Sequence, residues 1–293
     1  MKRILITGAD SYIGTSLEYW LLKYDMQYSV ETVNTKSEMW RNQDFGLYDV
    51  IFHVAGIAHA DTGNVTEAEK KRYYQVNCEL AYKVAKKAKE ERVKQFIFMS
   101  SMSVYGEAIG ARNYRITHNT TPNPCNFYGN SKLQAEKRLA ILEDDSFRVV
   151  ILRPPMIYGK NSKGNYPILS KIARKAPIFP DINNCRSMLY IDNLCEFIRL
   201  IIDNQEKGVF FPQNKEYVKT TEMVRLIALR YDRRIILIPG FDWLIYLLGR
   251  IPGKIGRLTG KAFGSIQYDM NMSEYKMDYR VSDFKDSIRC TER

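Results

Sequence analysis

The chain has 293 residues, which is enough for one large α/β domain or for a large domain that carries a smaller lobe. Its hydrophobic fraction of 45% is ordinary for a folded protein and argues against intrinsic disorder. The net charge of +11, from 44 basic and 33 acidic residues, favours anionic partners such as phosphates. No zinc-finger or RNA-binding spacing accompanies this charge, so we expect no binding to nucleic acid.

The apolar runs are too short for membrane insertion. The first run, Ile4–Ile6, is far shorter than the core of a signal peptide, and no run approaches the ~20 residues that span a bilayer. We therefore expect a cytoplasmic protein. The cysteines fit that compartment as free thiols, because their number is odd and no two have metal-ligand spacing, so we expect no metal site. They are Cys78, Cys125, Cys185, Cys195 and Cys290. A cysteine–histidine enzyme built on Cys125 is the weaker alternative.

The first half of the chain alternates short apolar runs with helical patterns. The runs lack polar alternation, which is typical of parallel strands buried on both faces. This order predicts an α/β fold with a doubly wound parallel sheet over residues 1–160. The expected strands are Arg3–Thr7, Ser29–Val33, Val50–Ala55, Gln95–Ser100 and Arg148–Arg153. The expected helices are Ile13–Lys23, Glu67–Glu91, which should break near Asn77, and Tyr128–Leu142.

After Arg153 the elements become shorter and prolines and glycines more frequent. Residues 161–293 are predicted to form a smaller lobe over the carboxyl ends of the strands, with residues from about 186 to 204 returning to the main sheet. The apolar run Phe241–Ile251 is expected to be buried against this lobe, and a helix on a membrane surface is the alternative. The expected helices are Pro167–Arg174, Asn193–Ile202, Thr221–Arg230 and Ser282–Cys290, and the expected strands are Met188–Ile191, Gly208–Phe211 and Arg234–Ile238.

A glycine-containing turn follows the first strand and opens the first helix. It reads Thr7-Gly8-Ala9-Asp10-Ser11-Tyr12-Ile13-Gly14. Backbone N–H groups and the helix dipole at such a turn favour the pyrophosphate of a dinucleotide. Two glycines six residues apart are by themselves equally consistent with an ordinary strand-to-helix turn.

Tyr128 and Lys132 lie four residues apart at the start of a predicted helix and therefore share one face. A nearby ammonium group lowers the pKa of a phenol, so Tyr128 can act as a general base or acid on an alcohol or carbonyl. For these two residues alone, a surface helix pair is the simpler interpretation.

Serines follow the strand Gln95–Met99 in the run Ser100–Gly106. Hydroxyl groups at the carboxyl end of a parallel strand point into the ligand crevice, where one can hydrogen-bond a substrate oxygen. A loop whose serines satisfy backbone groups is the alternative.

The order of these motifs, their spacing and their strand–helix context resemble the extended short-chain dehydrogenase/reductase family. Within that family they resemble the branch of NAD-dependent nucleotide-sugar epimerases and dehydratases. The resemblance runs through most of the chain, is strongest before Gly159, and implies a Rossmann-like sheet with a C-terminal substrate lobe. It implies that Ser101, Tyr128 and Lys132 are catalytic. The further matching segments are Asp49–Gly56, Asn77, Arg153–Gly159 and Arg186–Leu194.

The same resemblance implies which residues bind the ligands. The cofactor residues would be Gly8, Asp10, Ser11, Tyr12, Ile13, Gly14, Asn34, Val54, Ala55, Gly56, Asn77, Met99, Ser100, Tyr128, Lys132 and Pro154. The substrate residues would be Ser101, Asn165, Phe179 and Arg186.

The sequence departs from the family pattern at two places. Ser11 replaces the middle glycine of the phosphate turn, which must therefore accept a Cβ atom. Between Val33 and Asp49 there is too little chain for a helix, a strand and their connections, so one strand or helix should be lost or reduced. The expected cofactor is NAD. NADP is the alternative, because Asn34 stands near the position where NAD-specific members carry an acid.

Family members that dehydrate sugars carry Asp-Glu directly after the catalytic hydroxyl residue, where this chain has Met102 and Ser103. We therefore expect no dehydratase. A 4-epimerase of a UDP-hexose for surface polysaccharide is the first reading, and an NAD(P)H-dependent 4-ketoreductase is the second. In both, Tyr128, held as a phenolate by Lys132, would move the proton at O4, and Ser101 would hydrogen-bond that oxygen.

Two other readings stay open: a dinucleotide-binding regulator without turnover, and a reductase of non-sugar carbonyls. The retained Tyr128–Lys132 pair disfavours the regulator, and the long second half disfavours a small substrate. The resemblance also implies a homodimer formed through the helices Glu67–Glu91 and Tyr128–Leu142.

Overall fold

The computed structural model of the chain describes residues 1–24, 26–57, 66–106, 114–251 and 254–293. A six-stranded sheet in which every pair of neighbours is parallel forms its centre, in the order β10-β6-β4-β3-β1-β2. The predicted doubly wound parallel sheet is thus confirmed. The strands are β1 (Lys2–Thr7), β2 (Tyr28–Val33), β3 (Val50–His53), β4 (Gln95–Met99), β6 (Arg148–Leu152) and β10 (Gly208–Phe210).

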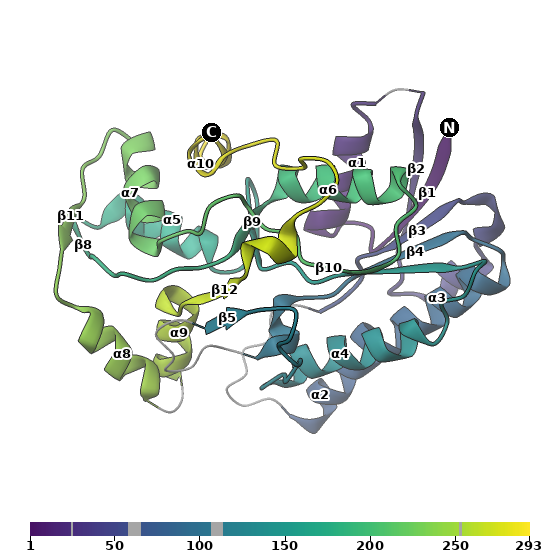
Figure 1. The fold of residues 1–293 in the computed structure, drawn as a ribbon, viewed down its shortest axis with the longest axis horizontal. Helices are drawn as coiled ribbons and strands as arrows, with labels where there is room; N and C mark the ends of the chain where they lie inside the picture. Colours follow the sequence, from purple (N-terminus) through teal and green to yellow (C-terminus); the bar gives the residue numbers. More distant parts are fainter. Residues whose placement is uncertain (25, 58–65, 107–113, 252–253) are drawn as a thin grey trace.

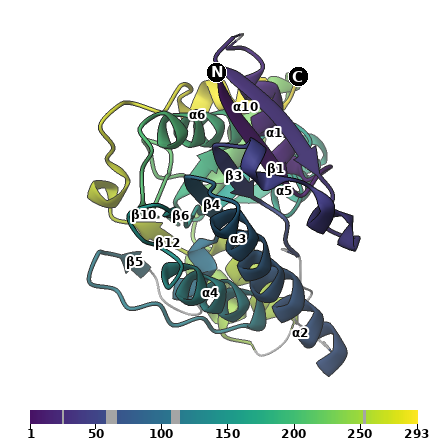
Figure 2. The ribbon, with the colours of Figure 1, turned by 90° about the vertical axis from the view of Figure 1, so that its right-hand side faces the viewer.

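Helices cover both faces of this sheet (Figures 1 and 2). On one face α1 (Tyr12–Leu21) packs against α6 (Ile191–Asp203). On the other face lie α2 (Glu67–Tyr74), α3 (Leu80–Glu90) and α4 (Phe127–Ala140). Side chains of β1, β3, β4 and β6 alternate between two hydrophobic clusters, one toward each helical layer, which explains why the strands have no polar face.

The short segment between β2 and β3 contains no regular strand or α-helix. Two 3-10 turns, Glu38–Asn42 and Phe45–Leu47, occupy it. Their apolar side chains Trp40 and Phe45 are fully buried and pack beneath the sheet beside α3. The predicted loss of one element is confirmed, and these two aromatic side chains fill the space that it leaves.

The helical segment of residues 67–90 breaks where the sequence predicted. A π-helical turn, Gln75–Glu79, separates α2 from α3 and buries Asn77 completely. Such turns insert one residue into the helix and re-aim the side chains around it. Here the turn directs Asn77 toward α4, where it donates to Ser131 Oγ.

The second half forms short elements beyond the carboxyl edge of the sheet (Figure 1). Its helices are α5 (Tyr166–Lys175), α7 (Thr220–Arg230), α8 (Asp242–Arg250), α9 (Lys254–Phe263) and α10 (Phe284–Thr291). Its strands form two-stranded parallel pairs, β8 (Ile178–Pro180) with β11 (Ile236–Ile238), β5 (Tyr114–Ile116) with β12 (Ile266–Tyr268), and β7 (Met156–Tyr158) with β9 (Met188–Tyr190).

The expected return of residues 186–204 to the main sheet needs a correction. β9 pairs with β7 and not with the six-stranded sheet, and α6 supplies a helical layer. The strand that joins the sheet is β10, which pairs with β6 through Phe210 and Leu152. The chain leaves β6 at Pro154-Pro155 and starts the separate strand β7, which then offers its edge to β9.

The expected burial of residues 241–251 is wrong. No residue of α8 is buried, and Trp243 and Leu247 are 63% and 55% exposed. α8 packs mainly on α9. One short neighbouring helix is not enough to bury its apolar side chains. Within the described part of the chain, no helix combines the length and apolarity needed to cross a membrane.

Candidate active site

Ser101 and Tyr128 come together because α4 starts directly against the loop after β4. Asn126 caps α4 by accepting a hydrogen bond from Gly129 N at 2.8 Å. A Cβ atom at Gly129 would lie 2.4 Å from Ser103 O, so only glycine permits this approach. The Tyr128 phenol is half-buried and faces Ser101, whose hydroxyl donates to Ser103 Oγ at 3.1 Å. The sequence-predicted pair is therefore assembled in the structure.

Lys132 lies one turn along α4, but it does not act on Tyr128 as we expected. Its Nζ donates to Met99 O at 2.7 Å and lies 4.7 Å from the Phe98 ring centroid. Burial lowers the pKa of Lys132 to about 8. Burial also raises the pKa of Tyr128, and the Ser101 side chain opposes that shift. The predicted lowering of the Tyr128 pKa by Lys132 is thus not found in this structure, because the ammonium group is held by a strand-end carbonyl.

Asn77 connects the segment after β3 to α4. Its amide accepts from Ile57 N at 2.8 Å and donates to Ile57 O and to Ser131 Oγ. Gly56 lies between these groups, and a Cβ atom there would come within 3.1 Å of Asn77 Oδ1 and 3.2 Å of Lys132 Nζ. The structure therefore brings Gly56, Asn77 and Lys132, three of the expected cofactor residues, into one cluster.

The turn after β1 is built for close approach to the end of β3. Gly8 has φ +104°, and a Cβ atom on it would lie 2.8 Å from Ala55 N, so glycine is required here. Ser11 has extended backbone and caps α1 by accepting from Gly14 N at 3.1 Å. The serine at this position of the turn is therefore accommodated without strain and satisfies one of the free N–H groups of the helix start.

Other expected cofactor residues also end at this edge of the sheet. Pro154 follows β6 and accepts from Met102 N at 2.9 Å, which joins it to the serine loop. Asn34 follows β2, is exposed, and caps its own turn by accepting from Lys36 N at 2.9 Å. The buried hydroxyl of Tyr12 lies beside Gly159, on which a Cβ atom would be 2.7 Å away from it.

Sequence reasoning missed a buried ion pair beneath the site. Arg153 forms a two-pronged pair with Glu136, with Nη2 at 2.6 Å from Oε2, and donates to the Tyr105 hydroxyl at 2.7 Å. Glu136 also accepts from the Ser100 hydroxyl. The spacing of Glu136 could have indicated its place near the site, because it lies one helical turn after Lys132 on the same face of the helix. This network fixes the strand ends that carry the serines.

The comparisons with known proteins agree with this geometry. Residues 4–211 match the NAD dependent epimerase/dehydratase family. This chain belongs to that family. It is therefore an NAD(P)-dependent enzyme of the extended short-chain dehydrogenase/reductase type, as the motifs indicated.

Two relatives of this family member are named as sugar epimerases. A UDP-glucose 4-epimerase of Vibrio cholerae is 31% identical over 306 residues, which cover 95% of this chain and 90% of the relative. An Escherichia coli O157:H7 protein, N-acetyl-α-D-glucosaminyl-diphospho-ditrans,octacis-undecaprenol 4-epimerase, is 26% identical over 283 residues (89% and 82%). The structure of a Bacillus cereus UDP-glucuronic acid 4-epimerase with NAD has a TM-score of 0.73 at 17% identity, covers 99% of this chain and 97% of its own, and supports the fold.

Three of the four expected substrate residues of this family member, Asn165, Phe179 and Arg186, lie in the second half. Phe179, in β8, packs on Phe263 of α9 with ring centroids 5.9 Å apart. Arg186 is almost fully buried, donates to Ala262 O at 3.1 Å, and burial lowers its pKa to about 10. The structure thus joins Phe179 and Arg186 through the end of α9. Asn165 stands at the N-cap position of α5.

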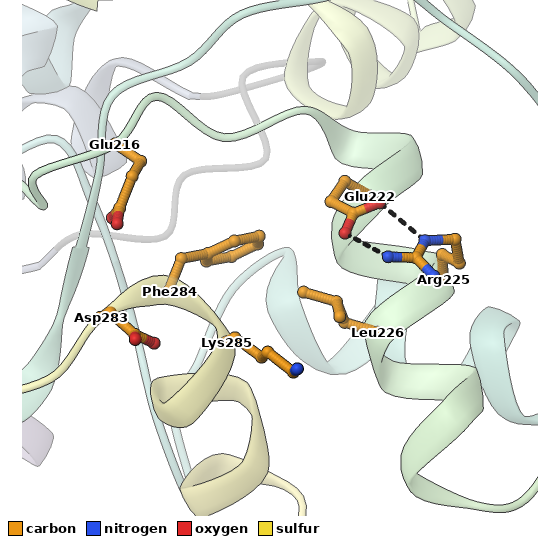
Figure 3. A pocket seen from close by; sticks show the side chains of 7 residues that line it. All are labelled: Glu216, Glu222, Arg225, Leu226, Asp283, Phe284 and Lys285. Carbon is orange, nitrogen blue, oxygen red and sulfur yellow. Dashed lines mark hydrogen bonds and ion pairs between the residues drawn. The ribbon is translucent and has the colours of Figure 1, made fainter.

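A separate surface hollow of about 300 Å³ lies between α7 and α10 (Figure 3). Its lining mixes charges of both signs, and Glu222 and Arg225 on α7 pair with each other there. None of the expected catalytic, cofactor or substrate residues lines it. The lining residues are Glu216, Glu222, Arg225, Leu226, Asp283, Phe284 and Lys285. We assign no role in the reaction to this hollow.

The described residues give no support to a metal enzyme or a cysteine–histidine enzyme. They contain no group of three or more potential ligands of the His, Cys, Asp and Glu types. Cys125 is exposed, and none of the five cysteines, all of which lie in the described ranges, is in a disulfide bond. His53 is buried beneath the sheet edge, shares a 2.7 Å hydrogen bond with the Thr7 hydroxyl, and has its pKa lowered to about 3 by burial. It is therefore a neutral core residue.

Proposed function

We propose that this enzyme is a UDP-hexose 4-epimerase that serves surface polysaccharide synthesis. The observation that carries the proposal is the Ser101–Tyr128 pair beside Lys132 at the carboxyl edge of the sheet. The 31% identity to a UDP-glucose 4-epimerase supports it, and Met102 and Ser103 argue against dehydration. NAD is the proposed cofactor, and NADP is the alternative because Asn34 stands where an acid would select NAD.

The residues at the sheet edge fit a dinucleotide. Gly8, Gly56 and Ala55 keep the ends of β1 and β3 free of large side chains, and the start of α1 offers N–H groups beside them. When bound there, the nicotinamide would accept and return hydride at the sugar carbon. The chain's own residues then have to hold the sugar oxygen and move its proton.

In the proposed mechanism Ser101 hydrogen-bonds O4 of the sugar, and Tyr128 exchanges the proton at that oxygen. The raised pKa keeps Tyr128 protonated at neutral pH, which suits donation to a C4 carbonyl during reduction. The oxidation step runs the same transfer backwards and needs the phenolate. We propose that Lys132, on the same helical face and positively charged below about pH 8, favours that state during the reaction, although in this structure it donates to Met99 O.

The released dinucleotide tests the proposal against its alternatives. An epimerase regenerates its cofactor in every cycle, so purified enzyme should release NAD⁺ on denaturation and should convert UDP-glucose to its 4-epimer without added cofactor. A 4-ketoreductase would instead consume one NADPH or NADH per product. Dinucleotide binding without turnover of any sugar would leave a reductase of non-sugar carbonyls or a regulator without turnover.

The carrier of the sugar is the second point to test. UDP is the proposed carrier, and a polyprenyl diphosphate is the second candidate, because the Escherichia coli relative that aligns over 89% of this chain is named for that substrate. Both carriers present a diphosphate next to the sugar. The same assay with each carrier separates them.

We further propose that residues 161–293 mainly bind the substrate and that Arg186 contacts its diphosphate. A buried guanidinium group makes short, strong hydrogen bonds to phosphate oxygens. Arg186→Ala should raise KM for the UDP-sugar by about tenfold or more with a smaller change in kcat, because ground state and transition state share the contact. Steady-state kinetics and a dinucleotide titration measure both effects. Loss of NAD(P) binding with unchanged KM would move Arg186 to the cofactor.

We also propose a cytoplasmic homodimer formed through α2–α3 and α4. These helices contact one another on one side of the sheet (Figure 2), where Arg138 of α4 pairs with Glu79. Sedimentation velocity at micromolar concentration should show a dimer. A charge reversal at Lys137, an exposed residue of α4, should weaken it, whereas the same change at Lys171 of α5 should not. A monomer in every sample contradicts the proposal.

A further inference from the structure

Most of the net charge of the protein comes from two segments. Residues 160–185 and 230–261 contain 12 basic and 3 acidic residues, which gives +9 of the total of +11. The rest of the chain is nearly neutral. The two segments contain α5, β8, β11, α8 and α9, and we call them the basic end.

Backbone and side-chain contacts hold these segments side by side. β8 pairs with β11, Ile236 N donates to Pro177 O at 3.0 Å, and Arg233 donates to Lys175 O at 3.3 Å. Asn183 N donates to Asp242 Oδ1 at 3.0 Å and so ties α8 to the segment after β8. Figure 1 shows these elements at one end of the molecule, away from α1 and β2.

Large apolar side chains are exposed on the same end. Trp243 and Leu247 lie one helical turn apart on α8 and share a face. Ile178 and Ile236 are opposite each other in the β8–β11 pair and are 51% and 66% exposed. Exposed apolar side chains that gather in one region of a surface mark an interaction site.

The basic side chains of this end are available for a partner. Nine of them belong to the part of the chain whose side chains the structure describes, and none of these nine forms a salt bridge with a described acid. Eight are exposed, and Arg233 is half-buried. They are Lys160, Lys163, Lys171, Arg174, Lys175, Arg230, Arg233, Arg234 and Arg250.

We propose that the basic end binds the surface of a bilayer that contains anionic lipids. A membrane interface offers both partners that this end requires: acyl chains for Trp243 and Leu247, and negative headgroups for the lysines and arginines. Nucleic acid would satisfy the charges but not the aliphatic side chains. A second copy would bring two strongly positive surfaces together. The inference goes beyond the proposed reaction and does not depend on it.

The test is sedimentation of the full chain with vesicles. We expect binding to phosphatidylcholine vesicles that contain about 30% phosphatidylglycerol, and little binding to phosphatidylcholine alone. Raising the salt from about 0.1 M to 1 M should weaken binding strongly, because the screening length falls from about 10 Å to about 3 Å. The tryptophan emission should shift to shorter wavelength on binding, and Trp243→Phe should remove that shift.

A matched pair of double variants separates the surface from net charge. Trp243→Glu/Leu247→Glu should bind anionic vesicles at least about tenfold more weakly. Tyr19→Glu/Leu22→Glu carries the same charge change on exposed apolar residues of the α1 region and should bind within about twofold of the unchanged protein. Both variants should keep the UDP-sugar turnover and circular dichroism of the unchanged protein. Vesicle binding therefore tests this proposal, and turnover independently tests the proposed reaction.

Three results would overturn the inference. They are no binding of the unchanged protein to anionic vesicles, equal loss of binding in both double variants, and a dimer in vesicle-free solution that only the Trp243/Leu247 variant loses. The last result would assign the surface to a second copy of the chain.

Discussion

Tyr128→Phe is expected to lower kcat by about 10²–10⁴-fold while the fold and the dinucleotide affinity stay unchanged. The substitution removes only the hydroxyl that faces Ser101, and the ring keeps its place at the start of α4. Without that hydroxyl, no group of the pair can exchange the proton at O4. Turnover of the UDP-sugar and the amount of released dinucleotide measure the two parts of the prediction.

Tyr73→Phe is the matched control. Tyr73 is buried, and its ring packs edge-on against Phe127, the residue before Tyr128, with centroids 4.8 Å apart. This change therefore deletes the same phenol hydroxyl from a neighbouring tyrosine. It should leave kcat within a few-fold of the unchanged enzyme. A Tyr128→Phe enzyme that turns over at a similar rate would refute the assignment of Tyr128 as the proton-transfer residue.

Glu136→Ala is expected to destabilise the protein by about 3–5 kcal/mol, because it leaves the buried Arg153 guanidinium without its carboxylate. Both side chains are shielded from water, with 3% and 11% exposure for Glu136 and Arg153, so solvent screens the pair little. Ser100 loses its hydrogen bond as well. Urea unfolding followed by circular dichroism measures the free-energy change.

The double variant Glu136→Leu/Arg153→Met serves as the control for this prediction. Removing both charges with apolar side chains of similar volume should restore most of the lost stability, because no unpaired charge remains buried. Its turnover should stay low, since the network no longer positions the serine loop. If Glu136→Ala unfolds at nearly the same urea concentration as the unchanged protein, then the ion pair does not stabilise the site.

Much of the fold could be predicted because its signals are local. The uninterrupted apolar runs of β1, β3, β4 and β6 are the pattern of strands buried on both faces, and helical periodicity between them requires parallel crossovers. The same order puts the carboxyl ends of all these strands at one edge. Ser101, Tyr128 and the Gly8 turn could therefore be placed together before any coordinates were known.

The sequence by itself determined the parallel sheet, the family and the residue types at the reaction centre, because each depends on short-range spacing along the chain. Tertiary structure alone decided that Lys132 binds Met99 O, that burial raises the pKa of Tyr128, and that Glu136 pairs with Arg153. It also decided that α8 is exposed and that β10 joins the sheet. Each of these outcomes depends on which distant groups surround a side chain or a strand edge, and that environment has no signature in local spacing.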